Sequence, residues 1–383
     1  MKVLFYFLGL VGLLGLTLSC GTQKVKNLTV GEVWTAEPNW TGSFQGLAEG
    51  LSALLPITTN SQEFENAERR PYLIKRIERL SEISSTAKHG LSPVRPDPRF
   101  TLIGNFLPQA FQNTLAMSNL DRIDLARHSL LQITATCIEC HQRSSQGPNL
   151  ASPDFDRYLI QQRPLDKAEY YLAVRKFDLA REALGQVISS ADEAANFFEV
   201  DRAIRYLMGI AVQFQMSSDL AEKDLQQVGA DTRLPFYLRH NMNAWTEAIR
   251  EWKIEKPVPL NFEYVESLIE KGAKAQAGFA DRGGDIYFFR SIHHLHQLIA
   301  GQSEAEAQAP LLFLLGTAYE AIRDLGVWRS HELYFEACVR KLPKSSWSQK
   351  CFERLQHNWQ ENWGLDVPPS IMQRMEELRL LSI

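Results

Sequence analysis

The chain has 383 residues, which is enough for two domains with separate hydrophobic cores. Its charge is nearly balanced, with 41 lysine and arginine residues against 45 aspartate and glutamate residues, so it lacks the basic excess typical of nucleic-acid-binding proteins. The sequence also lacks serine-hydrolase, zinc-protease and phosphate-loop motifs, and it offers no argument for an enzyme.

The first residues predict export from the cytoplasm. An apolar run from Val3 to Leu18 follows a single lysine and ends in small residues before Cys20. The run is somewhat short for a membrane span of about 20 residues, and no stop-transfer pattern follows it. This pattern is therefore typical of a signal peptide over residues 1–19.

Cys20 follows Leu-Thr-Leu-Ser and resembles the lipidated cysteine of bacterial lipoproteins. The resemblance implies a lipid on Cys20 that attaches the chain to a membrane, followed by a polar tether over residues 20–37. Gly21 after the cysteine implies sorting to the outer membrane, so we expect the chain on the periplasmic side of a bacterial envelope. Thr17 departs from the pattern, which usually has leucine there, and periplasmic secretion without a lipid is the alternative.

Four amphipathic segments follow the tether. They predict helices over about residues 41–55, 71–89, 100–117 and 122–143. Pro56 is expected to end the first helix and Gly90 the second. The short connection after the third segment predicts that neighbouring helices run antiparallel. Because the second half of the chain is also helical in pattern, the expected fold class is all-α.

The fourth segment ends in Cys-Ile-Glu-Cys-His, residues 137–141. On a helix Cys137, Cys140 and His141 share one face, so two thiols can add to the haem vinyl groups while the imidazole binds the iron. This spacing is the attachment signature of c-type haem. A thioredoxin-like site would follow a strand and open a helix, and a zinc site would need a second ligand pair. One covalent haem c is therefore predicted.

Four helices with this motif near the end of the last resemble the class II c-type cytochromes, the cytochrome c-prime group, over about residues 38–147. The resemblance implies a four-helix haem bundle in which His141 is the proximal iron ligand. Low-spin members use a methionine on the first helix as the distal ligand, but the first helix here carries none. His89, at the end of the second helix and at the same pole as the motif, is the candidate distal ligand. An open or apolar distal side is the alternative.

Three further polar residues lie near the motif in the sequence. Arg127 and Arg143 could contact haem propionates, but a solvated helix face is the favoured interpretation for each. His128 is expected at the surface.

A linker is expected over residues 148–163, and residues 164–383 predict paired helices. Aromatic and small residues recur there in the order found in tetratricopeptide repeats: Tyr171, Phe177, Ala180 and Leu184, then Leu315, Gly316, Tyr319, Phe335 and Pro343. The resemblance implies a helical solenoid whose concave surface docks a redox partner protein or a peptide. A helical domain that packs on its own haem domain is the alternative.

The remaining cysteines predict a disulfide, because an oxidising compartment leaves few unused thiols. Cys338 and Cys351 lie in two helical stretches joined by a turn at Pro343. A bond between them would contribute about 3 kcal/mol through the entropy of the closed loop. Two separately buried thiols are the alternative.

A histidine cluster in the second half raises the question of a metal site. His293 and His296 share a helix face but His294 does not, and no acidic residue at matching spacing is near except Asp285. A solvated or pocket-lining cluster is therefore favoured over a metal site.

Together these patterns predict an extracytoplasmic mono-haem c-type cytochrome that transfers single electrons rather than acting as a catalyst. One alternative is a haem-based binder or sensor of NO or CO with five-coordinate iron. Another is an envelope scaffold protein in which the haem chiefly stabilises its domain.

Overall fold

The computed structural model describes residues 44–86, 98–141, 159, 162–190, 197–229, 234–276, 278, 281–364 and 367–383. All regular structure in these residues is helical, and no strand occurs among them. The all-α fold class predicted from the sequence is confirmed.

The first half of the chain supplies one short and four longer described helices. They are α2 (Phe44–Thr58), α3 (Ser61–Glu65), α4 (Arg70–Thr86), α5 (Pro98–Asn119) and α6 (Ile123–His141). Helix α4 packs against α2 and α5, and α6 packs against α5 and α2. The apolar side chains that recur at helical spacing in α4, Leu73, Ile77 and Leu80, are buried between these helices.

Pro56 lies inside α2 and does not end it, so that expectation is wrong. Proline removes one N–H donor, but only the last two residues of the helix follow it. The hydroxyls of Thr58 and Thr59 donate to the carbonyl oxygens of Leu54 and Leu55 at 2.8 and 2.9 Å. These bonds supply partners for carbonyls in the final turn, and the helix continues to Thr58.

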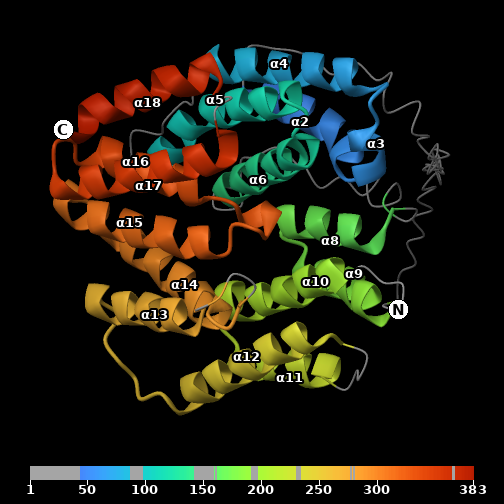
Figure 1. Ribbon diagram of the computed structural model, residues 1–383, viewed down its shortest axis with the longest axis vertical. Helices are drawn as coiled ribbons and strands as arrows, with labels where there is room; N and C mark the ends of the chain where they lie inside the picture. Colours follow the sequence, from blue (N-terminus) through green and yellow to red (C-terminus); the bar gives the residue numbers. More distant parts are fainter. Residues whose placement is uncertain are drawn as a thin grey trace, which may run out of the picture.

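The second half forms a longer series of helices, which Figure 1 shows stacked from α8 to α18. They are α8 (Pro164–Ala173), α9 (Phe177–Ser189), α10 (Phe197–Gly209), the π-helix η1 (Ile210–Phe214), α11 (Ser218–Gly229), α12 (Phe236–Ile254), α13 (Phe262–Ala275), α14 (Asp285–Gly301), α15 (Ala305–Ala321), the 3₁₀ turn η2 (Gly326–Trp328), α16 (His331–Lys341), α17 (Ser346–Trp363) and α18 (Pro369–Ser382). Most helices pack against their neighbours in sequence. At Gly316 a Cβ atom would overlap the ring of Phe335, so glycine allows α15 and α16 to approach closely.

The two halves bury a common hydrophobic core that includes residues from Leu47 in α2 to Leu378 in α18. Helix α6 packs against both α8 and η2, and it lies beside α8 in Figure 1. The C-terminal helices also return to the first half, because the guanidinium of Arg122 lies 5.4 Å from the ring centroid of Trp363. In this structure the second half therefore packs on the first.

Cys338 in α16 and Cys351 in α17, the pair for which the sequence predicts a disulfide, are bonded to each other. After the connecting turn, the backbone N–H of Lys344 donates to the carbonyl oxygen of Leu381 at 2.8 Å. The last three helices are thus joined by one covalent link and one backbone hydrogen bond.

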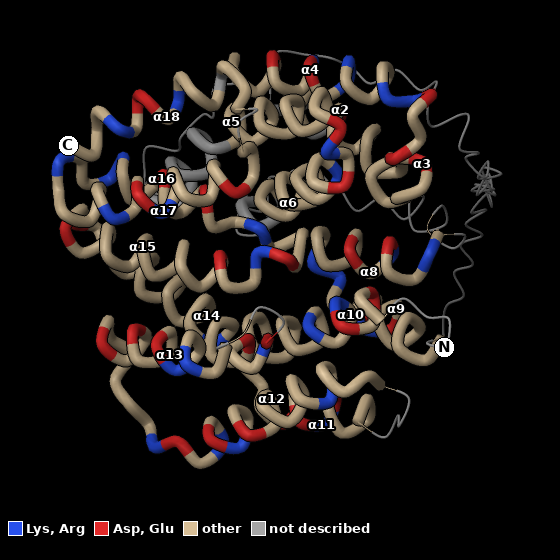
Figure 2. Tube along the Cα trace, in the orientation of Figure 1, with Lys and Arg blue, Asp and Glu red and all other residues tan. Residues whose placement is uncertain are grey.

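Basic and acidic residues alternate over the described helices, and neither sign gathers on one side of the molecule (Figure 2). This mixture agrees with the near-neutral composition. No helix in the described ranges is long and apolar enough to cross a membrane.

Candidate functional site

Helix α6 extends through His141, so the Cys-x-x-Cys-His motif forms its last turns. Cys137 is half-buried and packs against a small apolar cluster of Leu55 from α2, Leu159, and Tyr170 and Val174 from the α8 segment. The side chains of Cys140 and His141 lie outside the part of the chain that the structure describes, as do the whole of Cys20, His89 and Arg143.

Arg127, on α6 before the motif, is buried, so the expectation of a solvated helix face is wrong. Its guanidinium donates to Asp166 at 2.9 Å and to Glu169 at 2.8 Å, both on α8. The third donor, Nε, reaches the carbonyl oxygen of Thr58 at 2.8 Å. Asp166 also accepts from the hydroxyl of Ser61 at 3.0 Å. These contacts join α2, α3, α6 and α8 at one point.

His128 is buried in the same cluster and does not lie at the surface as expected. Its Nε2 lies 3.3 Å from Glu169 and its Nδ1 lies 3.0 Å from the carbonyl oxygen of Asp124. Gly326 of η2 packs directly on the imidazole, where a Cβ atom would overlap the ring. The helix face that carries Arg127 and His128 is therefore covered by α8 and η2.

The charges of this cluster reinforce one another. Burial acts to lower the pKa of His128, but the Glu169 carboxylate and the bonds to Asp124 and Glu169 outweigh it, and the net shift is upward. Burial acts to raise the pKa of Glu169, but Arg127 and His128 hold that pKa well below its usual value. Glu169 is therefore an anion that favours the protonated state of His128.

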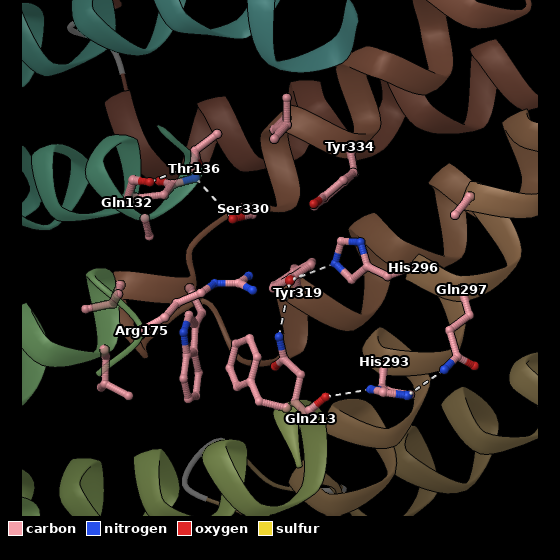
Figure 3. A pocket seen from close by; sticks show the side chains of 17 residues that line it. Gln132, Thr136, Arg175, Gln213, His293, His296, Gln297, Tyr319, Ser330 and Tyr334 are labelled. Carbon is pink, nitrogen blue, oxygen red and sulfur yellow. Dashed lines mark hydrogen bonds between the residues drawn. The ribbon is translucent and has the colours of Figure 1, made fainter. Parts of the chain in front are cut away.

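A cavity of about 460 Å³ lies against α6, one turn before Cys137. Its walls come from α6, η1, α14, α15, η2 and α16, from Leu172 of α8 and from Arg175, which follows the C-cap of α8 (Figure 3). Gln132 of α6 donates across the cavity to the hydroxyl of Ser330 at 3.3 Å. The cavity thus joins segments that are far apart in the sequence.

Two histidines of the predicted cluster line this cavity. The Nδ1 of His293 is 2.8 Å from the carbonyl oxygen of Gln213, so Nδ1 carries the proton and donates. His296 contacts the hydroxyl of Tyr319 at 3.1 Å. Gln297 donates to the Nε2 of His293 at 2.9 Å. The pocket-lining interpretation is confirmed for His293 and His296.

His294 lies on a different face of α14 and packs edge-on against the rings of Tyr264 and His293. Burial, with help from the neighbouring His293 and Arg290, lowers its pKa to about 4. No group of three potential metal ligands occurs within the described ranges.

Trp328 of η2 forms one wall of the cavity, and Gly209 fixes its position. A Cβ atom at Gly209 would overlap the indole, so glycine at the end of α10 lets the ring lie on the helix backbone. Tyr206 and Phe289 meet the indole edge-on, with ring centroids 5.1 and 5.8 Å away. The wall is therefore held from behind by close packing.

Comparison of the chain with models of known protein families, with curated proteins and with solved structures gives no match. Its residues and their geometry are therefore the basis for assigning a function.

Proposed function

We propose that the chain is an extracytoplasmic mono-haem c-type cytochrome that transfers single electrons. The observation that carries the proposal is the Cys137-x-x-Cys140-His141 spacing in the last turns of a helix, with Cys137 half-buried against apolar side chains. The proposal places the protein in a bacterial periplasm, attached to the outer membrane through a lipid on Cys20.

The residues present fit a covalent haem. The donor set of two thiols and one imidazole has the i, i+3 and i, i+4 spacing that brings all three to one helix face. Leu55, Tyr170 and Val174 are buried beside Cys137 and make its surroundings apolar, as a porphyrin needs. A haem held there would supply a one-electron couple whose potential depends on its ligands and burial.

The chain's own part is to hold the end of α6 in place. The ion cluster at Arg127 fixes α6 to α8 before the motif, and α8 also carries part of the apolar cluster around Cys137. Both sides of the proposed haem site therefore belong to helices that are joined by buried, charge-assisted hydrogen bonds. Such a site would keep the helices that hold the haem in place while an electron was gained or lost.

The rest of the proposal follows the resemblances. The first four longer helices would form a class II type haem bundle with His89 as the distal ligand. The helices from α8 to α18 would be a tetratricopeptide-like array that docks the redox partner. The close contact of Gly316 with Phe335, two residues of the repeat-like pattern, supports that interpretation.

The test uses the two cysteine pairs of the chain as matched variants. Mature protein made with the c-type maturation machinery should exceed its polypeptide mass by one haem, and the haem should stay attached after denaturation. The double variant Cys137→Ser/Cys140→Ser should lose the attached haem, whereas Cys338→Ser/Cys351→Ser should keep it. A colourless protein with no added mass would contradict the proposal.

Two spectra test the coordination. His89→Ala should change the visible spectrum of the reduced protein if His89 binds the iron, and an unchanged spectrum would remove His89 from the site. Rapid binding of CO by the reduced wild type would instead favour five-coordinate iron and a gas-binding function.

A further inference from the structure

Aromatic side chains make up much of the wall of the cavity against α6. Trp328 of η2 and Phe214 of η1 lie side by side in it, with ring centroids 5.7 Å apart. Tyr319 of α15 and Tyr334 of α16 are stacked, with ring centroids 5.3 Å apart and an interplanar angle of 11°. His296 of α14 meets both tyrosine rings edge-on. Rings from five segments of the chain therefore line one space of about 460 Å³, which lies within the size range of small-molecule sites.

Two unusual backbone segments contribute to the same wall. The π-helix η1 supplies Gln213 and Phe214, and the N–H of Gln215 closes its wide turn by donating to the carbonyl oxygen of Ile210 at 3.0 Å. Arg175 has a left-handed φ of 58°, and the central carbon of its guanidinium lies 5.2 Å from the ring centroid of Phe214. Short π-helical segments and left-handed residues other than glycine occur preferentially at functional sites. Their convergence on one cavity favours a binding site over a packing defect.

Gln213 carries a buried polar group that the fold leaves incomplete. The residue is only 5% exposed, and its Nε2 donates to the hydroxyl of Tyr319 over a long distance of 3.4 Å (Figure 3). Its Oε1 has no hydrogen-bond partner among the described residues. Buried acceptors normally have a partner. Because the bond to Tyr319 is long and weak, a small rotation of the amide would present Oε1 to a donor in the cavity.

We propose that this cavity binds a planar aromatic alcohol. Its ring system would lie against the aromatic side chains of the walls, and its hydroxyl would donate to Oε1 of Gln213. A phenolic hydroxyl suits this position because it is a neutral donor at the edge of a flat ring and adds no charge to a buried site. The proposal goes beyond electron transfer and does not depend on a haem at Cys137.

Titration calorimetry on the mature full-length protein tests the site with three probes. Naphthol has the flat rings and the hydroxyl, fluoronaphthalene keeps the rings but cannot donate, and decahydronaphthol keeps the hydroxyl but is not flat. The wild type should bind naphthol about tenfold more tightly than fluoronaphthalene, because a hydrogen bond to a buried acceptor contributes on the order of 1.4 kcal/mol, which is a factor of ten. Decahydronaphthol should bind about fivefold more weakly than naphthol, because it loses the ring contacts.

Gln213→Met removes the amide and keeps a side chain of similar length, so the fold should persist. This variant should bind naphthol about tenfold more weakly and fluoronaphthalene almost unchanged. Gln297→Met is the matched control, because Gln297 also lines the cavity but its amide donates to Nε2 of His293 at 2.9 Å. The control should leave both affinities unchanged.

Urea unfolding without a probe separates a binding role of Gln213 from a structural one. Gln213→Met should be at least as stable as the wild type, because it removes an unpartnered buried acceptor, and a clear loss of stability would instead make Gln213 a structural residue. The proposal is also overturned if the wild type binds none of the probes or binds any two of them equally. Retention of the preference for naphthol in Gln213→Met would overturn it as well.

Discussion

Two arginines at opposite ends of α8 show how the same side chain serves two different environments. Arg127 meets the first turns of α8, where Asp166 and Glu169 close around it and exclude solvent. Arg175 follows the last turn and faces a cavity whose described lining contains no carboxylate. The surroundings make the difference, because Asp166 and Glu169 bind Arg127 between helices, whereas Arg175 lies against the ring of Phe214 at the wall of the cavity.

The largest expected effect on stability is at the buried ion cluster of Arg127, Asp166 and Glu169. Arg127→Ala would leave Asp166 and Glu169 buried without their main counter-charge, and we expect the free energy of unfolding to fall by about 3–5 kcal/mol. Urea unfolding followed by circular dichroism measures this change.

The control for Arg127 is an exposed ion pair. Arg79→Ala removes the pair of Arg79 and Glu82 on α4, whose side chains are 48% and 58% exposed, and should change stability by less than about 1 kcal/mol. If Arg127→Ala lowers the free energy of unfolding as little as Arg79→Ala does, the buried ion cluster does not hold the helices together.

His128→Gln tests the charge coupling within the cluster through pH. The folded pKa of His128 is raised, so its contribution is complete below the unfolded pKa of about 6.5 and is lost as pH rises through the folded pKa. The stability difference between wild type and variant should therefore be largest below pH 6.5 and shrink at higher pH, by an amount on the order of 1 kcal/mol.

Thermal unfolding over a pH series measures that difference. His357→Gln is the matched control, because the side chain of His357 is exposed and pairs with Glu361 on the same helix. A constant difference between wild type and His128→Gln at every pH would show that folding does not shift the pKa of the histidine, and a difference that falls as pH drops below about 6.5 would show that the histidine is neutral in the fold.

The smallest effect on stability is expected at Arg175, just after the C-terminal end of α8. Arg175→Gly relieves the left-handed strain and loses the contact with Phe214, and these two changes oppose each other. Stability should therefore change by less than about 1 kcal/mol, as measured by the same urea titration. A loss as large as that of Arg127→Ala would mean that Arg175 is a structural residue and would erase the contrast between the two ends.

Local patterns in the sequence were sufficient to predict most helices. Apolar spacing placed α4, α5 and α6 to within a few residues, and Pro164 marked the start of α8. Helix α3 was missed because five residues are too few to show a period. The disulfide between Cys338 and Cys351 could be predicted because the two cysteines lie in neighbouring predicted helices joined by a short turn.

The burial of Arg127 and His128 could not be predicted from the sequence in the same way. A polar helix face predicts exposure to solvent. Here α8 packs on that face and supplies the carboxylates of Asp166 and Glu169 that cover it. Their spacing of three residues on one helix was the single local hint. The cavity could not be predicted either, because its walls come from segments that the fold brings together and the left-handed conformation of Arg175 leaves no mark in the sequence.

The packing of Trp328 on Gly209 sets the size of the cavity against α6. Even a methyl group on Gly209 would push the indole forward, into the space where an occupant would lie. The size of ligand that the cavity accepts can therefore be changed at a residue that does not contact the ligand. Substitution of Gly209, which does not line the cavity, would change whether the cavity accepts larger or smaller ligands.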